Sequence, residues 1–244
     1  MKTSGNTIFI TGGATGIGLA VAEALMERDN RVVICGRRRG RLLAAKKRIP
    51  QLEVRVCDVS QPAMRAALVR WMKLRFPALN ILINNAGIQR AIDFSKGSRD
   101  LRYVDEEIAT NLAAPIHLAA LLIPTLKRRR QAAIVNISSG LGFTPMAEVP
   151  VYCATKAALH SWSLSLRYQL RETSVRVFEI VPPMVATDLG GRRRDPEENH
   201  RAMSAETLAQ ASVKALENDD YEVAVGAAAG LRDQRERLFS RINQ

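Results

Sequence analysis

The sequence is poor in cysteine, and its few cysteines have no arrangement that would support a disulfide framework. The 244 residues contain only Cys35, Cys57 and Cys153, and no two of them are spaced as a CxxC pair. Three cysteines cannot all pair within one chain, whereas small secreted folds depend on several such bridges. The composition therefore favours a reducing compartment, and we expect a cytoplasmic protein.

Histidine and long apolar runs are scarce as well. His117, His160 and His200 lie far apart without metal-ligand spacing, so we predict no metal site. No apolar run reaches the ~18 to 20 residues that a membrane-spanning helix needs, and the N-terminal residues contain no signal-peptide core. We therefore predict no membrane span.

Acidic residues are outnumbered, because 24 Asp and Glu face 36 Lys and Arg, for a net charge of +12. Much of the excess lies in four basic runs, at residues 37–39, 46–48, 127–130 and 192–194. Such runs can bind nucleic acid, but these fall in separate connecting segments without interleaved aromatic residues or a DNA-reading motif. We interpret most of them as solvated loops and helix ends and predict no nucleic-acid partner.

A glycine-rich turn follows the first apolar run. Residues 7–10 are apolar and predict a buried strand, TGGATGIG follows at residues 11–18, and apolar residues then recur with helical spacing. In a strand–turn–helix unit of this kind, glycines let the backbone approach a pyrophosphate at the positive end of the helix. The spacing is GxxxGxG and not GxGxxG, so a purely structural turn is the alternative.

The end of the second predicted strand, residues 31–35, bears on the choice of dinucleotide. An acidic residue at this point would bind the adenosine ribose 2′-hydroxyl, but the chain continues with Gly36, Arg37 and Arg38. An arginine fork pairs well with a 2′-phosphate, so the sequence favours NADP, although NAD also fits. The alternative is an arginine-rich loop on a basic protein.

Strands alternate with helical patterns along the whole chain. The predicted strands cover residues 7–10, 31–35, 52–57, 80–83, 133–137, 175–181 and 221–225. The predicted helices include residues 42–49, 62–75, 104–127 and 205–217, with a bend in the third of these near Asn111. This alternation predicts an α/β fold, a Rossmann-like doubly wound parallel sheet of about seven strands with helices on both faces. No linker or repeat divides the chain, so residues 1–244 are expected to form a single domain.

Tyr152 and Lys156 are four residues apart on a predicted helix that begins at Pro150, and Ser138 and Ser139 lie shortly before it. Residues i and i+4 share a helix face, so the phenol and the ammonium can meet. A phenol has a pKa of about 10, and a nearby cation favours the phenolate and lowers that pKa. We expect Tyr152 to exchange protons with an alcohol or carbonyl oxygen. A YxxxK pair alone is common on helices, so its meaning depends on the other motifs.

Together, the motifs resemble those of the short-chain dehydrogenase/reductase family. They are TGGATGIG, Asp58, NNAG at residues 84–87, Asn111, Ser139 and YCATK at residues 152–156, in this order over almost the whole chain. Within the family, the segments NNAGIQ, PVYCATKAALHS and VPPMV look like oxidoreductases associated with D-alanylation of teichoic acids. The resemblance implies an NAD(P)-dependent oxidoreductase that interconverts an alcohol and a carbonyl, and it implies a homodimer or homotetramer.

The resemblance also assigns roles to individual residues. Tyr152 would be the acid/base, Lys156 would lower its pKa and hold the nicotinamide ribose, Ser139 would bind the substrate oxygen, and Asn111 would hold a water that passes protons to Lys156. The residues implied in cofactor binding are Gly12, Thr15, Gly16, Ile17, Gly18, Arg37, Arg38, Asp58, Val59, Asn85, Ala86, Gly87, Tyr152, Lys156, Pro182, Val185 and Thr187.

Two regions leave the substrate unidentified. Residues 140–150 and a substrate loop at about 189–202 are expected to shape the pocket. Most family members have Pro-Gly after the sixth strand, whereas this chain has Pro182 and Pro183, and a proline fixes φ and removes an N–H close to the expected nicotinamide site.

A cofactor-binding regulatory or scaffold protein without catalysis is the alternative function. Met184, Phe143 and Met146 fit either a pocket or the core, while Cys153, Trp162 and Leu166 are expected to pack.

Overall fold

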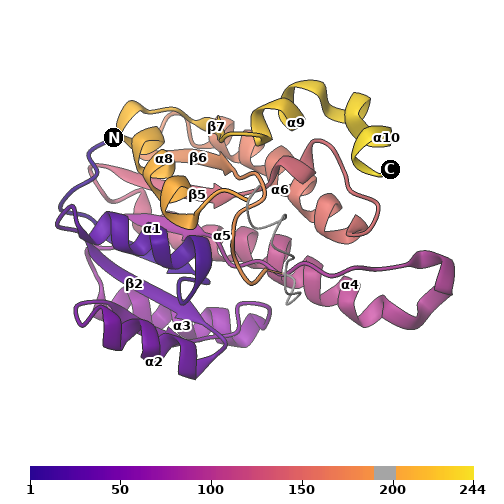
Figure 1. The fold of residues 1–244 in the computed structure, drawn as a ribbon. Helices are drawn as coiled ribbons and strands as arrows, with labels where there is room; N and C mark the ends of the chain where they lie inside the picture. Colours follow the sequence, from indigo (N-terminus) through magenta and orange to yellow (C-terminus); the bar gives the residue numbers. More distant parts are fainter. Residues whose placement is uncertain (190–201) are drawn as a thin grey trace.

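The computed structural model describes residues 1–189 and 202–244 and contains one seven-stranded parallel sheet (Figure 1). The strand order is β3-β2-β1-β4-β5-β6-β7. The strands are β1 (Thr7–Thr11), β2 (Arg31–Gly36), β3 (Glu53–Val56), β4 (Ile81–Asn84), β5 (Ala132–Ile137), β6 (Val175–Val181) and β7 (Glu222–Ala224). The predicted doubly wound α/β fold is confirmed.

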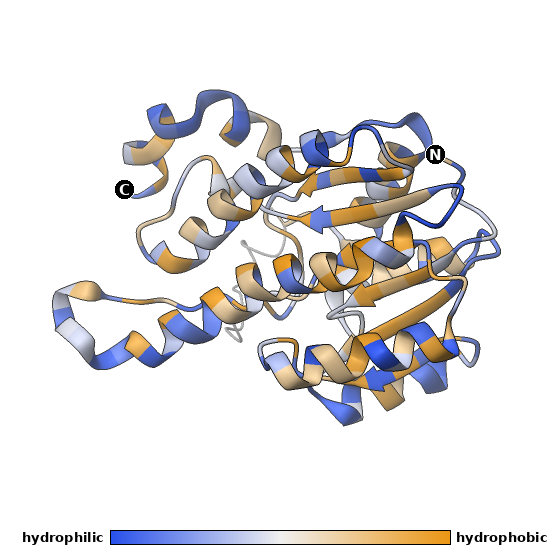
Figure 2. Ribbon diagram, turned by 180° about the vertical axis from the view of Figure 1, so that it is seen from behind, coloured by the Kyte–Doolittle hydropathy of each residue, from blue (hydrophilic) through white to orange (hydrophobic). Residues whose placement is uncertain are grey.

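Helices cover both faces of the sheet and build two hydrophobic cores. One core lies under α1 (Gly16–Met26), α2 (Arg39–Arg48) and α8 (Ala205–Asn218); the other lies under α3 (Pro62–Arg75), α5 (Ala114–Leu126) and α6 (Pro150–Gln169). Figure 2 shows the strands as mostly hydrophobic between helices whose outer turns are hydrophilic. Strands covered on both faces read as continuous apolar runs, which is why the sequence predicted them well.

The strand order reverses between β1 and β4, and this reversal marks the edge of the sheet where a ligand-binding site is expected. The chain leaves β1 toward β2 and β3, and then crosses back to β4 on the other side of β1. In open parallel sheets, ligands bind outside the carboxyl ends of the strands at such a switch point. The glycine-rich turn after β1 and the NNAG segment that ends β4 both lie there.

The longest predicted helix is interrupted. In place of one helix over residues 104–127, the chain forms a 3₁₀ segment η1 (Phe94–Asp100), then α4 (Leu101–Ile108), a π-helical turn η2 (Ala109–Ala113) and α5. The predicted bend near Asn111 is therefore a π-helical turn, a feature often found at functional sites. Figure 1 shows α4 projecting from the body of the molecule.

The helical stretch over residues 94–126 is long and apolar enough to cross a membrane by length and composition, with a mean hydropathy of 1.5 in its most apolar window. Of that window, 44% is buried inside the fold, where Leu118, Leu122 and Leu126 pack in the core under α5. This is weak evidence for a span, because the core helix of a globular protein has the same properties.

Several boundaries differ from the predictions. Helix α2 begins at Arg39, before the predicted residue 42, because its first turn is polar and carries no apolar signal. Three short C-terminal elements were not predicted: α9 (Ala228–Gln234), η4 (Arg235–Leu238) and α10 (Phe239–Ile242). They depend on tertiary contacts, such as the Thr144 Oγ1 hydrogen bonds to the carbonyls of Leu231 and Arg235, at 3.0 and 2.9 Å.

Candidate active site

The glycine-rich turn lies directly against the end of β4. Asn85 Nδ2 donates to the carbonyls of Thr11 and Gly12, at 3.0 and 3.2 Å. A Cβ added to Gly18 would lie 2.4 Å from Asn85 Nδ2 and 2.6 Å from the Gly12 carbonyl oxygen. Gly12 and Gly16 have φ of +67° and +55°, a region that favours glycine. The turn is thus a tight cradle before the N-terminus of α1.

This packing predicts the effect of filling the cradle. Gly18→Ala should lower the free energy of unfolding by about 1–3 kcal/mol, because the methyl group meets backbone that cannot move freely. Gly40→Ala, in the first turns of α2, is the matched control: its Cβ would face open space, and it should be neutral or stabilising by about 0.5–1 kcal/mol. Urea unfolding of the two variants measures both values, and equal stabilities would contradict the packing argument.

The side of the cradle toward the edge of the sheet is formed by the ends of β2 and β3. The Cys57 N–H donates to the Gly36 carbonyl at 3.0 Å, which holds the two strand ends together. Asp58 Oδ1 accepts from the Ser60 N–H and hydroxyl at 2.9 and 2.7 Å, and Val59 is buried. The Arg37 side chain is exposed and forms no hydrogen bond or ion pair within the described residues, and the same is true of Arg38. Both guanidinium groups are therefore available to an anion at this edge.

Thr187 closes the other side of the cradle. A Cβ added to Gly16 would lie 2.9 Å from Thr187 Cγ2, and the segment is held by hydrogen bonds to Met203, from the Ala186 N–H at 2.8 Å. Val185 is buried in the core, and the Pro182 carbonyl accepts from the Gly140 N–H at 3.0 Å. Of the three residues of this segment predicted to bind the cofactor, Thr187 therefore borders the cradle, whereas Val185 lies in the core and Pro182 is bonded to Gly140. The predicted substrate loop at 189–202 falls mostly on residues 190–201, outside the described residues.

Asn111 is placed by the π-helical turn. Its Oδ1 accepts from the Ile88 N–H at 2.9 Å, and its Nδ2 donates to the Ile88 carbonyl at 2.8 Å and to Thr155 Oγ1 at 3.2 Å. The side chain is therefore occupied in joining the NNAG segment to α6. Pro115, four residues on, has no N–H to donate to the Asn111 carbonyl. The main-chain oxygen of Asn111 thus lacks its usual i+4 partner.

Lys156 and Tyr152 lie together under the same segment. The Lys156 side chain is 4% exposed, and Nζ donates to the Ile137 carbonyl at 2.8 Å and lies 5.6 Å from the centroid of the Tyr152 ring. A Cβ added to Gly87 would be 3.8 Å from Lys156 Nζ and 3.6 Å from Asn111 Oδ1. The glycine therefore keeps open the space that these groups face.

The pKa values of this pair differ from the prediction. Burial raises the pKa of Tyr152 to about 12, against a hydrogen bond with Ser139 that lowers it. Burial also lowers the pKa of Lys156 to about 8, against the nearby Glu179, which raises it. The predicted downward shift of the phenol by Lys156 is wrong for this structure. Its physical reason is that the ammonium is bonded to Ile137 and does not contact the phenol oxygen.

Ser139 caps the short helix η3 (Gly140–Gly142), and its Oγ accepts from the Leu141 N–H at 3.1 Å. Its hydroxyl also hydrogen-bonds with the Tyr152 phenol, which lowers the pKa of that phenol. Beside it, Tyr152 belongs to an apolar cluster with Val149 and Cys153, against which Leu141, Met146 and Leu189 pack. The Cys153 thiol packs as predicted, accepting from the Met146 N–H at 3.3 Å.

The sequence left open whether Met146, Phe143 and Met184 line a pocket or belong to the core, and the structure answers differently for each. Met146 packs against the Tyr152 cluster, Phe143 is a core residue with Val181 and Ala228, and Met184 is 44% exposed. Trp162 and Leu166 pack in the core of their own chain. The outer face of α6 instead exposes Leu164 and Tyr168.

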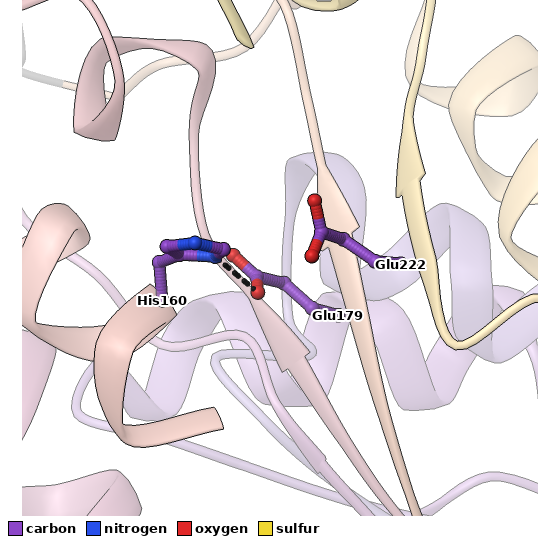
Figure 3. A group of neighbouring side chains, drawn as sticks. All are labelled: His160, Glu179 and Glu222. Atoms are coloured by element: carbon purple, nitrogen blue, oxygen red, sulfur yellow. Dashed lines mark hydrogen bonds and ion pairs between the residues drawn. The ribbon is translucent and has the colours of Figure 1, made fainter. Parts of the chain in front are cut away.

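A polar cluster behind α6 was not predicted. His160, Glu179 and Glu222 come from α6, β6 and β7 and place one ligand atom each within 4.8 Å of one another (Figure 3). Glu179 is fully buried, and its Oε2 lies 2.8 Å from His160 Nδ1, while Glu222 pairs with Arg232. The hydrogen bond to Glu179 raises the pKa of His160. Each carboxylate thus has its own cationic partner, and the prediction of no metal site stays a prediction. The sequence feature that could have indicated this cluster is Glu179, a glutamate inside the apolar strand β6.

The His160–Glu179 pair predicts that the free energy of unfolding depends on pH. Because the pKa of folded His160 is raised, its contribution is fully present below the unfolded value of about 6.5 and is lost as pH rises through the folded value. His160→Gln leaves the Glu179 carboxylate buried without its cation and should cost about 3 kcal/mol at pH 6, and less at pH 9. Urea unfolding at both pH values measures this, and a cost that does not change with pH would contradict it.

Comparisons with known proteins agree with this geometry. A family model described as short chain dehydrogenase matches residues 6–198. The chain is 47% identical over 248 residues to the uncharacterized oxidoreductase DltE of Bacillus subtilis (strain 168), covering 100% of this chain and 98% of that protein. A short-chain dehydrogenase structure from Sphingobium yanoikuyae in complex with NADPH is 28% identical, with a TM-score of 0.82 and coverage of 98% and 97%. A short chain dehydrogenase/reductase from Burkholderia phymatum in complex with NAD has a TM-score of 0.86 over 100% and 97% of the two chains, at 21% identity, which shows the fold alone.

Proposed function

The chain belongs to the short-chain dehydrogenase family, and from this membership we propose that it is an NADP-preferring oxidoreductase that interconverts an alcohol and a carbonyl. Its similarity to DltE agrees with the predicted subgroup, the oxidoreductases associated with teichoic-acid D-alanylation. The observation that carries the proposal is the convergence of Asn111, Ser139, Tyr152 and Lys156 beside a glycine cradle at the carboxyl edge of the sheet.

The cradle fits a dinucleotide. A Cβ at Gly12, Gly16 or Gly18 would fill it, and the N-terminus of α1 supplies N–H groups for a pyrophosphate. Thr187 and Asn85 border the same space, Asp58 and Val59 lie at the adenosine side, and Lys156 would hold the nicotinamide ribose. When bound, the nicotinamide supplies or accepts the hydride.

The proton chemistry belongs to this chain's own residues. In the direction of reduction, Tyr152 donates its phenol proton to the carbonyl oxygen, and the Ser139 hydroxyl donates a hydrogen bond to the same oxygen. Lys156 has two N–H donors beyond the one used by Ile137, and it returns a proton to Tyr152. A water on the main-chain oxygen of Asn111 supplies that proton, since the Asn111 side chain is occupied.

The surroundings of Tyr152 favour an apolar substrate. Leu141, Met146 and Leu189 pack against the cluster that Tyr152 forms with Val149 and Cys153. Such a lining binds hydrocarbon next to the reacting carbon, where a few polar groups fix the oxygen. We place an aldehyde or ketone with an apolar substituent, or the corresponding alcohol, in this pocket.

The exposed face of α6 supports self-association. Leu164 and Tyr168 are 44% and 67% exposed, and Ala154, Ala157 and Ser161 continue the same face at helical spacing. We propose that this face pairs with a second copy in a homodimer or homotetramer, which light scattering during gel filtration measures. The buried free thiols of Cys35, Cys57 and Cys153 fit a reducing cytoplasm, where we place the enzyme.

The test is a titration of the purified protein with NADPH and NADH, followed by nicotinamide fluorescence. We expect saturable binding of both, tighter for NADPH, followed by NADPH oxidation with an apolar aldehyde or ketone. Tighter binding of NADH would refute the cofactor preference alone. Binding of neither would refute the enzyme and favour a non-catalytic role for the fold.

A further inference from the structure

Thr155 carries a buried hydroxyl that joins two parts of the site. It lies on α6 directly before Lys156, it is 3% exposed, and its Oγ1 makes two hydrogen bonds. The hydroxyl donates to the Tyr152 carbonyl at 2.8 Å and accepts from Asn111 Nδ2 at 3.2 Å. A helical threonine often bonds back to the preceding turn of its own helix. The bond with Asn111 is additional, and it ties α6 to the π-helical turn.

The bond within α6 fixes what Thr155 can offer to Asn111. A hydroxyl has one proton to donate and two lone pairs that accept. Because the proton is used toward the Tyr152 carbonyl, the hydroxyl can only accept from the Asn111 amide. The branched Cβ of a threonine also restricts rotation about χ1. Thr155 therefore presents a single acceptor in a fixed position.

This acceptor completes the hydrogen bonding of the Asn111 amide. Asn111 Oδ1 accepts from the Ile88 N–H at 2.9 Å, and Nδ2 donates to the Ile88 carbonyl at 2.8 Å. A primary amide has two N–H protons, and Thr155 accepts the second one. Turning the amide around would set its oxygen against the Ile88 carbonyl and the lone pair of Thr155. The orientation of the amide is thus determined, and neither of its N–H groups is left for a water.

The proposed proton relay runs beside this amide. Lys156 Nζ and Asn111 Oδ1 lie 3.8 and 3.6 Å from the position that a Cβ on Gly87 would take. The main-chain oxygen of Asn111 lacks its i+4 donor, because Pro115 has no N–H. A water on that oxygen can pass a proton to Lys156 only if it keeps a lone pair free for the next proton from solvent. An amide N–H without a partner at this place would compete for that lone pair.

We propose that Thr155 is a positioning residue that keeps the Asn111 amide out of the proton relay and so sets the rate at which Tyr152 regains its proton. The inference rests on the proposed function. In each reduction the phenol proton goes to the carbonyl oxygen, and the Lys156 ammonium gives a proton to the phenolate. The water then gives a proton to the Lys156 amine and takes one from solvent. Thr155 touches none of the reacting atoms and acts through Asn111.

The experiment compares two rates of reduction of an apolar ketone by NADPH. In a single turnover with enzyme in excess, Tyr152 starts with its proton, whereas steady-state kcat requires that proton to return. Thr155→Val removes the hydroxyl and keeps the shape of the side chain. It should leave the single-turnover rate within about twofold and lower kcat about 5–10-fold, as expected for one lost hydrogen bond. The solvent deuterium isotope effect on kcat should rise with it. Thr155→Ser keeps the hydroxyl and should recover most of kcat.

Ser212→Ala is the matched control. Ser212 on α8 is also buried, and its hydroxyl bonds back to the Leu208 carbonyl of its own helix at 2.8 Å, with no second partner among the described residues. Both rates should therefore equal those of the wild type. Thr155→Cys serves if the valine variant does not fold, because a thiol is of similar size and accepts only weakly. It should show the same difference between the two rates at smaller amplitude.

A fall of both rates together in Thr155→Val would indicate a structural role and overturn the inference. An unchanged kcat, or a serine variant as slow as the valine variant, would overturn it as well. Each of these outcomes leaves the proposed function intact, because the wild type still turns over. A wild type without turnover on any carbonyl refutes the proposed function, and the inference falls with it.

Discussion

Tyr152→Phe should lower kcat for carbonyl reduction by about 10²–10⁴-fold, the usual contribution of a positioned acid or base. The substitution removes only the phenol oxygen from a ring that is buried among Val149, Cys153 and the Ser139 segment. NADPH binding should therefore change little, because the ring and the cradle stay in place. Steady-state rates at saturating NADPH and a fluorescence titration of the variant measure the two effects separately.

The matched control for this substitution is Tyr168→Phe. Tyr168 lies on the outer face of the same helix, the face proposed for self-association, and contacts Arg171 there; the variant keeps the ring and loses only the hydroxyl, so its rate should equal that of the wild type. Retention of more than about a tenth of the activity by Tyr152→Phe would remove the tyrosine from the proton transfer. Loss of NADPH binding together with activity would indicate a structural role instead.

Arg37→Ala should weaken NADPH binding about 10–100-fold and leave NADH binding within about twofold, because a charge-assisted pair with the 2′-phosphate is worth ~1.5–3 kcal/mol. Arg37 directly follows β2 and has no partner among the described residues that would compete for it. Arg39→Ala, two residues on in the exposed first turn of α2, is the control and should keep the preference. Fluorescence titration of the wild type and both variants with NADPH and NADH measures the six dissociation constants.

Equal losses for NADPH and NADH would contradict the 2′-phosphate assignment and make Arg37 a general anion contact. An unchanged NADPH affinity in Arg37→Ala, with a loss in Arg38→Ala, would move the contact by one residue. Salt dependence separates these outcomes further, since an exposed phosphate pair weakens with ionic strength.

Most of the fold was predictable because the five inner strands are largely buried on both faces, whereas the edge strands β3 and β7 are only partly buried. β5, for example, is an unbroken buried run over Ala132–Ile137, and such runs between helical patterns determine the doubly wound sheet. The position of the candidate site could be predicted from motifs at strand ends, because the carboxyl ends of parallel strands meet at one edge of the sheet. The glycine turn follows β1 and Asn85 follows the adjacent strand β4, and in the structure Asn85 Nδ2 donates to the carbonyls of Thr11 and Gly12.

The polar row under α6 could not be predicted, because it depends on strand register. Asn84, Asn136, Glu179 and Glu222 are direct neighbours across β4, β5, β6 and β7. Asn84 Nδ2 donates to Asn136 Oδ1 at 2.9 Å, and Asn136 Nδ2 donates to Ser163 Oγ at 2.8 Å. These residues are far apart in the sequence, and a one-residue slip would place them on the other face.

The pKa of Tyr152 was mispredicted for a related reason. The spacing of Tyr152 and Lys156 shows that they share a helix face, but it does not show which atom Nζ contacts. In the structure Nζ donates to Ile137 on β5, and burial dominates the phenol.

The most direct test of the central claim is deuterium transfer in a single turnover. The wild type would be mixed with NADPH deuterated at C4 of the nicotinamide and with an apolar ketone, and the product analysed by mass spectrometry. Deuterium at the carbinol carbon of the alcohol, formed by the wild type and lost in Tyr152→Phe, is the result predicted here. Tight NADPH binding with no deuterium in any product, across a panel of aldehydes and ketones, would contradict the claim that Tyr152 and its neighbours form an oxidoreductase site.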